Sequence, residues 1–321
     1  MQTLSERNPT PAPPDHRRWR TPSTLIAITA LASTLILAGC ALSPLAKRTA
    51  SFSTAAAATV QDASNAYQVV EQAHQQMDID KLVVTFDPTK PNQLVLKSFL
   101  TDQDLQAHTD ALNGIQQYAE LLAEVSGDQP LTALDAPATA LATSIKNISA
   151  NDFTKAGISS DEIDAGVAGL HFLGQLLIEH DRSKKLPKIL NDMDPHLQSI
   201  CALLKAEIGT PKTRGLRNEL LTSYDGQIQY HLTYIKLNAA SLTPAEKRSE
   251  IEALPKLVEA SKQADQTLAA TAEALDQLAK THHALATSAN KKESVSFKVH
   301  LAELIRDGQN ISAFYNTLES Q

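Results

Sequence analysis

Residues 257–285 read LVEASKQADQTLAATAEALDQLAKTHHAL, and this stretch decides the fold class. Small and apolar residues recur along it at alternating steps of four and three: Leu257, Ser261, Ala264, Leu268, Thr271, Leu275, Leu278, His282 and Leu285. In an α-helix these steps place all of the residues on one side. Helices that pack lengthwise in bundles and coiled coils show this pattern. The stretch therefore predicts a long helix with helical neighbours.

The same spacing returns in other segments, including 134–148, 163–177, 186–204 and 297–318. Together with the boundary signals, it predicts helices over 49–78, 102–126, 131–149, 159–182, 186–208, 213–239, 243–288 and 293–319. The short connections favour antiparallel neighbours. The sequence thus predicts an all-α, antiparallel bundle of about seven or eight helices.

Composition agrees with a helical fold. Aromatic residues make up 4% of the chain and there are only 11 glycines, which disfavours strands and tight hairpin turns. The net charge is −7 and the body has no long basic run, so nucleic acid is not expected as a partner.

Local signals mark several helix boundaries. Residues 243–246 combine an N-cap threonine, a proline at the first helical position and a glutamate three residues after the cap. Residues 159–162 form a second capping box. Pro187, Pro195 and Pro255 fall within or near patterned segments, so we expect breaks or kinks there.

One segment departs from the helical pattern. In residues 79–100, two β-prone runs flank the Pro-rich stretch 87–92. This arrangement predicts a short β-hairpin or an extended arm. An isolated hairpin is marginally stable in water, so the segment should pack on the bundle as a plug or contact a partner.

Three glycines, Gly166, Gly169 and Gly174, lie inside a predicted helix. Each costs up to about 1 kcal/mol relative to alanine there. We expect them to allow close approach of a neighbouring helix; a cofactor bound in the gap is the alternative.

Residues 1–39 have the three parts of a signal peptide. Arg17, Arg18 and Arg20 precede an uncharged apolar run over 25–38, which small residues follow. The run is shorter than the roughly 20 residues that a membrane-spanning helix needs. We therefore expect a cleaved signal rather than a permanent span.

The run ends in Leu37, Ala38, Gly39 and Cys40, a tetrad that resembles the lipobox of bacterial lipoproteins. The resemblance covers residues 17–41. It implies cleavage before Cys40 and a covalent lipid on its thiol, the only cofactor expected. Ala41 stands where an aspartate favours the inner membrane. The resemblance thus implies the periplasmic face of the outer membrane, if the host has two membranes.

These signals divide the chain into a signal peptide at 1–39, a short lipidated tether at 40–49 and a single helical-bundle domain at 50–321. The second cysteine, Cys201, lies on an apolar helical stripe, so a buried, inert thiol is expected.

Residue types that bind metals are densest in one region, which contains His171, Glu179, His180, Asp192, Asp194 and His196. Helix-end caps and solvated charges are the favoured explanation of the group, and a metal site is the alternative. A Glu-x-x-His spacing occurs at 71–74, whereas a di-iron bundle needs two. His282 lies on the long apolar stripe, which favours a hydrogen-bonded core histidine.

The sequence contains no Gly-x-Ser-x-Gly elbow, Cys-x-x-Cys pair or Gly-rich phosphate loop. An enzyme is therefore not favoured. We expect a membrane-tethered bundle that acts as an interaction, scaffold or envelope-maintenance module on a protein partner. Two alternatives are a periplasmic bundle that binds a ligand or metal, and a membrane-active protein that uses residues 82–99 as an apolar tongue.

Overall fold

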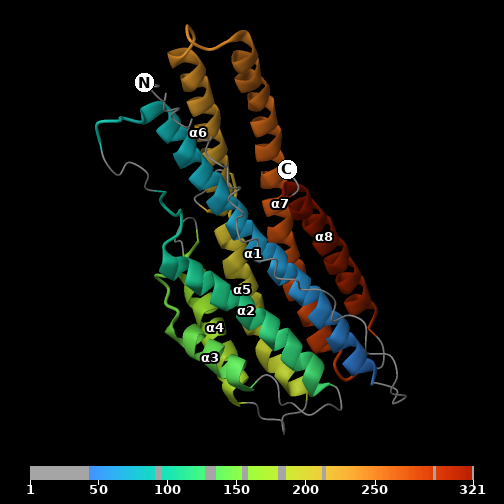
Figure 1. The fold of residues 1–321 in the computed structure, drawn as a ribbon. Helices are drawn as coiled ribbons and strands as arrows, with labels where there is room; N and C mark the ends of the chain where they lie inside the picture. Colours follow the sequence, from blue (N-terminus) through green and yellow to red (C-terminus); the bar gives the residue numbers. More distant parts are fainter. Residues whose placement is uncertain are drawn as a thin grey trace, which may run out of the picture. The chain divides into compact units, whose positions relative to one another are not determined.

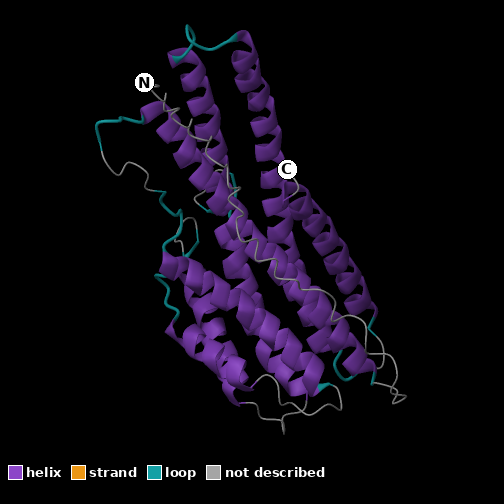
Figure 2. Ribbon diagram, in the orientation of Figure 1, coloured by secondary structure: helices purple, strands orange, loops and turns teal. Residues whose placement is uncertain are grey.

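In the part of the chain that the structure describes, the predicted long helix is α7, and seven further helices accompany it (Figure 1). The computed structural model describes residues 43–90, 96–126, 135–153, 158–179, 186–211, 215–291 and 294–319. Its helices are α1 (Pro44–Thr85), α2 (Asp102–Val125), α3 (Asp135–Asn147), α4 (Ser160–Glu179), α5 (Leu186–Ile208), α6 (Leu216–Leu237), α7 (Pro244–Thr287) and α8 (Val295–Glu319). The described residues contain no strand (Figure 2), so the all-α prediction is confirmed.

The first helix begins earlier than predicted. Ser43 caps α1 by accepting a hydrogen bond from the amide of Ala46 at 3.1 Å, and Pro44 occupies the first helical turn. A serine cap followed by proline is a strong start signal, because the proline lacks an amide hydrogen that the helix could not use there. Residues 44–49, predicted as part of a tether, are therefore helical.

The predicted hairpin or arm at 79–100 is wrong in its first part, because α1 continues to Thr85. The amide of Phe86 still donates to the carbonyl of Leu82 at 2.8 Å. The described residues 86–90 and 96–100 form loop and turn, and 91–95 lie outside the described part. β-propensity is a weak preference that packing can override, and here α1 finds a helical neighbour in α6.

The capping boxes are confirmed, and of the breaks or kinks predicted at two prolines, the breaks are wrong and the kinks stay a prediction. Thr243 and Glu246 bond each other's backbone at the start of α7, as Ser159 and Glu162 do before α4. Pro195 lies within α5 and Pro255 within α7, and both helices continue past them.

Helix α7 spans the length of two other helices. Helix α5 runs antiparallel to its second half, with Asp194 beside His282, and α6 follows along its first half, with Arg217 bonded to Asp265. Helix α1 packs against α2, α6, α7 and α8. Its buried side is rich in alanine, which lets the neighbouring helices come close: Ala46, Ala55, Ala56, Ala63, Ala66 and Ala73.

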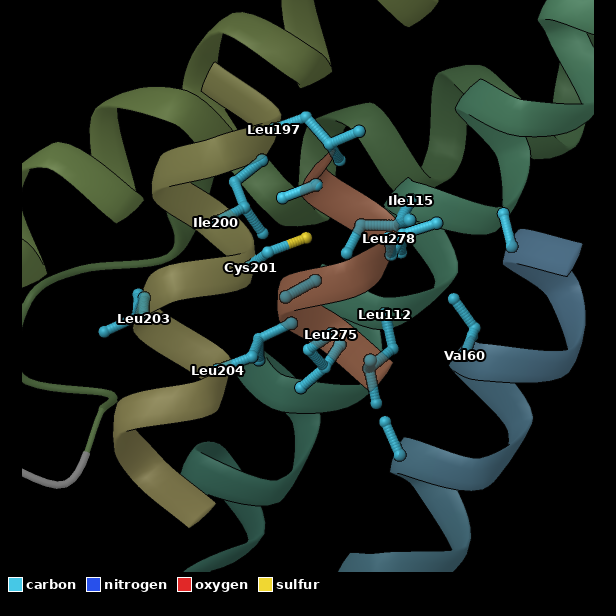
Figure 3. Close-up of a cluster of buried hydrophobic side chains, with 14 of the residues drawn as sticks. Val60, Leu112, Ile115, Leu197, Ile200, Cys201, Leu203, Leu204, Leu275 and Leu278 are labelled. Atoms are coloured by element: carbon cyan, nitrogen blue, oxygen red, sulfur yellow. The ribbon is translucent and has the colours of Figure 1, made fainter. Parts of the chain in front are cut away.

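Figure 3 shows how α5 and α7 share the core. Leu204 of α5 lies near Leu275 of α7, and the Cys201 side chain points from α5 toward α7 (Figure 3). Cys201 is buried, as predicted, and burial raises the pKa of its thiol to about 12, with the charge of Asp276 adding to the rise. The thiol is therefore protonated at neutral pH and unreactive.

The predicted close approach at the helical glycines is confirmed. A Cβ on Gly166 would lie 2.6 Å from a methyl carbon of Leu203, and one on Gly169 would lie 2.8 Å from the backbone oxygen of His196. Both contacts join α4 to α5. Protein atoms thus already occupy the space that a cofactor would need beside these two residues.

The helices form two regions that differ in burial. We call residues 74–86 and 228–260 the tip, which comprises the end of α1, the second half of α6, the α6–α7 turn and the first part of α7. All tip residues are described, and none of them is buried. We call the other described residues of the helical unit the body, which contains the hydrophobic core.

Candidate functional site

The predicted metal cluster does not come together in the described part of the chain. His171 bonds the carbonyl oxygen of Ile148 at 3.1 Å, and His196 stacks on Phe172 with ring centroids 4.1 Å apart. Asp192 pairs with Lys188 at 2.7 Å in an exposed ion pair.

The other members are Asp194, which faces α7, and two residues without a described side chain. His180 and the Glu179 side chain lie outside the described residues. Elsewhere in the described part, no three His, Cys, Asp or Glu side chains gather where they could hold a metal ion. The metal site stays a prediction that the described members do not support.

Asp194 instead anchors a hydrogen-bonded chain that crosses three helices. Its carboxylate accepts from His282 Nδ1 at 3.0 Å and lies 2.7 Å from His283 Nδ1. The other ring nitrogen of His282 accepts from the Tyr118 hydroxyl at 2.7 Å. The prediction of a hydrogen-bonded core histidine is confirmed at His282.

The charge states of Asp194 and His282 follow from their burial and from their hydrogen-bond partners. Burial raises the pKa of Asp194, but hydrogen bonds from His282 and His283 outweigh it, and the net pKa is lowered. Burial lowers the pKa of His282 despite the nearby carboxylate. An ionised aspartate and a neutral imidazole therefore join α5 to α7.

In a second buried hydrogen-bond network, the histidine is protonated rather than neutral. His108 Nε2 lies 2.5 Å from Glu207 Oε2, and each side chain is only 1% exposed. The other ring nitrogen donates to the backbone oxygen of Asp104, so both nitrogens face acceptors. Burial alone would lower the pKa of His108. The Glu207 carboxylate and these hydrogen bonds raise the pKa by more than burial lowers it, so the net pKa is raised. The pair is an imidazolium and a carboxylate, and the Tyr67 hydroxyl donates to the same carboxylate at 3.3 Å.

Neither of these two buried hydrogen-bond networks is arranged for catalysis. The hydroxyls of Tyr118 and Tyr67 face inward, and burial raises the pKa of both well above the ordinary value. A nucleophile must reach a substrate, and both tyrosines are buried. The Asp194 network instead links α2, α5 and α7, and the Glu207 network links α1, α2 and α5.

A groove of about 1260 Å³ runs along α5 and α7. The cations on its wall are occupied by acids of α7. Lys280 lies 2.6 Å from Asp276, Lys205 lies 3.4 Å from Glu273, and the Arg217 guanidinium binds Asp265 through two nitrogens. These cations therefore pair with neighbouring acids of the chain.

In the described part of the chain, the tip contains most of the exposed large apolar side chains. Among the described residues, twelve large apolar side chains are exposed, and seven lie in the tip: Ile79, Val83, Phe86, Leu232, Leu237, Ile251 and Val258. The tip is also ordered by polar contacts. His231 of α6 lies 2.8 Å from Glu250 of α7 and 3.9 Å from Asp80 of α1, so α6 contacts both of its neighbours.

Apolar residues are exposed in the tip because, among the described helices, none covers it. Figure 1 shows α6 between the ends of α1 and α7, without the further helices that cover α1 and α7 in the body. A row of three helices leaves two faces open to solvent, so apolar residues on those faces stay exposed. Exposed apolar surface of this kind marks sites of protein or membrane interaction.

The residues of the predicted lipobox, Leu37, Ala38, Gly39 and Cys40, lie outside the described residues. Within the described part, no helix combines the length and the apolar character needed to cross a membrane.

Sequence reasoning missed the His108–Glu207 pair and the tip. One signal was available for the pair. His108 lies four residues before Leu112 and Glu207 four residues after Leu203, so each charged residue falls on an apolar stripe. The tip had no such signal, because its exposure depends on where the other helices end.

No known protein-family model, curated protein or solved structure matches this chain.

Proposed function

We propose that this chain is a lipid-anchored envelope protein that binds a protein partner through its tip and so serves as an interaction or scaffold module. The observation that carries the proposal is the tip itself, which exposes seven large apolar side chains and buries none. Exposed apolar surface supports this proposal because it is more common at interaction sites than elsewhere on a monomeric protein.

The length of α1 supports a reach away from the anchor. Its 42 residues are continuous. At 1.5 Å per residue the helix is about 63 Å long, so its two ends are that far apart. Cys40 precedes α1 by four positions, whereas the tip contains the other end of the helix. An anchored chain of this form would hold the tip far from Cys40. In a host with two membranes, Ala41 favours the outer one.

The tip is tested by site-specific photocrosslinking in the native host. A photoreactive residue at Leu237 or Ile251 should capture the same partner, because both positions are exposed in the tip. The matched control is Gln309, an exposed residue on α8 in the body. The double variant Leu237→Asp/Ile251→Asp should abolish capture from a third site at Phe86. Equal capture from Gln309, or capture that survives the double variant, would contradict the proposal.

The anchor is tested separately by mass spectrometry of the mature amino terminus. We expect a chain that begins at Cys40 and carries lipid on its sulfur. The Cys40→Ser variant should leave the membrane fraction, since acyl chains contribute about 0.8 kcal/mol per buried methylene. An unmodified thiol in the native protein would exclude the anchor while leaving the tip crosslinks to be judged on their own.

A further inference from the structure

We propose that one end of the body rests on anionic phospholipid headgroups of the membrane that holds Cys40. This inference depends on the lipid anchor proposed above. The surface, called the base here, consists of Lys47 on α1, Lys291 in the α7–α8 turn, and Val295, Lys298 and Val299 on α8.

Arg48 fixes the α7–α8 turn against the start of α1. Its guanidinium donates to the backbone oxygen of Ser288 at 3.0 Å, to the Ser288 hydroxyl at 2.8 Å and to the backbone oxygen of Lys291 at 2.8 Å. Arg48 is itself only 9% exposed, so these bonds form in a largely buried setting. Lys47 and Lys291 therefore lie at the same end of the body.

Helix α8 begins at that end too. It runs parallel to α1, because the Ser312 hydroxyl donates to Asp62 at 2.9 Å and the turn preceding α8 is bonded to Arg48. Val295 lies 17 residues before Ser312 and Pro44 lies 18 residues before Asp62. With an equal rise per residue, the two helices start at nearly the same level.

The chemistry of the base suits a lipid surface. Val295 is 76% exposed and Val299, one turn later, is 49% exposed. Lys47, Lys291 and Lys298 are exposed around them, and none forms an ion pair with a described carboxylate. Exposed apolar side chains flanked by lysines suit a membrane surface, because the apolar atoms can enter the headgroup layer while the ammonium groups meet lipid phosphates.

The short link between Cys40 and α1 favours the membrane, rather than a protein, as the binding partner of the base. Four positions separate Cys40 from Pro44, a reach of about 14 Å at full extension. Lipid on Cys40 would therefore hold the start of α1 within that distance of the headgroups. The tip lies at the other end of the roughly 63 Å helix and cannot take this role.

The test uses the full chain, matured with its lipid and reconstituted in vesicles. Because Cys201 is buried, one new cysteine provides the accessible thiol for an environment-sensitive nitrobenzoxadiazole dye. Ala302→Cys places the dye one turn beyond Val299 on α8, and Ala245→Cys places it in the tip; both alanines are exposed. Vesicles contain phosphatidylcholine alone or mixed with phosphatidylglycerol, and a nitroxide lipid serves as the quencher.

We expect lipid quenching at position 302 in the mixed vesicles, much weaker quenching in neutral vesicles, and none at position 245. The variant Lys47→Gln/Lys291→Gln/Lys298→Gln should lower the ratio of docked to undocked base by about fivefold per lysine at low salt. The matched variant Lys236→Gln/Arg248→Gln/Lys256→Gln in the tip should leave quenching unchanged.

Each other outcome overturns the inference in a recognisable way. An acylated chain with no quenching at 302, or with equal quenching in both vesicle types, excludes the anionic contact and leaves the anchor intact. A concentration-dependent blue shift without vesicles would identify a second copy as the occupant. An unmodified Cys40 in the mass spectrum would remove the anchor and, with it, the premise of the base contact.

Discussion

In the body, α7 buries Leu268, Leu275 and Leu278 almost completely, whereas in the tip the same helix leaves Ile251 52% exposed and Val258 55% exposed. Both parts of α7 have large apolar side chains, but their neighbours differ, and the part in the tip is also richer in charged residues. In the body, α1, α5 and α8 contribute to the core around α7, and in the tip α6 is its nearest companion. The burial of apolar side chains along α7 therefore depends on how many helices reach a given level of the bundle.

The same difference governs the polar pairs. His108 and Glu207 are sealed in the body at 1% exposure, whereas His231 and Glu250 in the tip are about one quarter exposed. A buried pair depends on both partners, because either charge left alone would lack solvation. A solvated pair contributes little.

The largest expected effect separates these two pairs. His108→Ala leaves the Glu207 carboxylate buried without its cation and should lower the free energy of unfolding by about 3–5 kcal/mol. His231→Ala should lower it by less than about 1 kcal/mol. Urea denaturation followed by circular dichroism measures the free energy of unfolding of both variants. Similar decreases in the two variants would contradict the distinction between body and tip.

Apolar truncations within one helix give the next largest contrast. Leu278→Ala opens a cavity in the packed core (Figure 3) and should cost about 2–5 kcal/mol. Ile251→Ala, in the same helix, should change stability by at most about 0.5 kcal/mol. A large cost at Ile251 would show that the isolated tip already buries this residue, for example in a dimer, and dilution would then reduce that cost.

A buried carboxyl in the body supplies a pH test. Burial raises the pKa of Asp62 to about 6, although the hydrogen bond from Ser312 opposes the rise. A carboxyl with a higher pKa in the folded chain binds protons more tightly there, so the free energy of unfolding falls as the pH rises from about 4 to 6.

Asp62→Asn removes this dependence. Relative to the parent chain, the variant should gain about 1–3 kcal/mol of stability between pH 4 and pH 7. Denaturation at both pH values measures the difference between the two proteins. A constant difference would mean that Asp62 titrates normally and that its environment in the body resembles solvent.

The smallest effect compares two capping boxes. Thr101 caps α2 and Thr243 caps α7 in the tip, each with a reciprocal bond to the residue three positions later. Thr101→Ala should cost about 1 kcal/mol. Thr243→Ala should cost less in global unfolding if the tip opens before the body, while amide hydrogen exchange in residues 244–250 should become faster. Equal global costs would show that tip and body unfold together.

Local patterns in the sequence predicted most of the fold. The bounds of α5 were predicted without error at 186–208, because an apolar stripe, a following glycine and a nearby proline all mark them. The ends of α1 were both missed. Its start depends on a serine cap followed by proline, and its last turns contain β-branched Val83 and Val84, whose preference packing against α6 overrides.

The candidate sites were harder to predict because their residues are distant in sequence. Asp194 and His282 are 88 positions apart, and His108 and Glu207 are 99 apart. Spacing along a single helix contains no information about such pairs. The tip is likewise a property of the assembled bundle: Leu237 and Ile251 are both exposed, and among the described helices only α1, α6 and α7 extend into this region (Figure 1).

The three bonds of Arg48 also determine how the fold would bear mechanical load. A pull applied at residue 43 acts along the axis of α1, which is held by α2, α6, α7 and α8 along its length. Such a force must shear one helix past its neighbours rather than peel them apart one contact at a time. Through Ser288 and Lys291, the guanidinium also passes part of the tension directly into the α7–α8 turn.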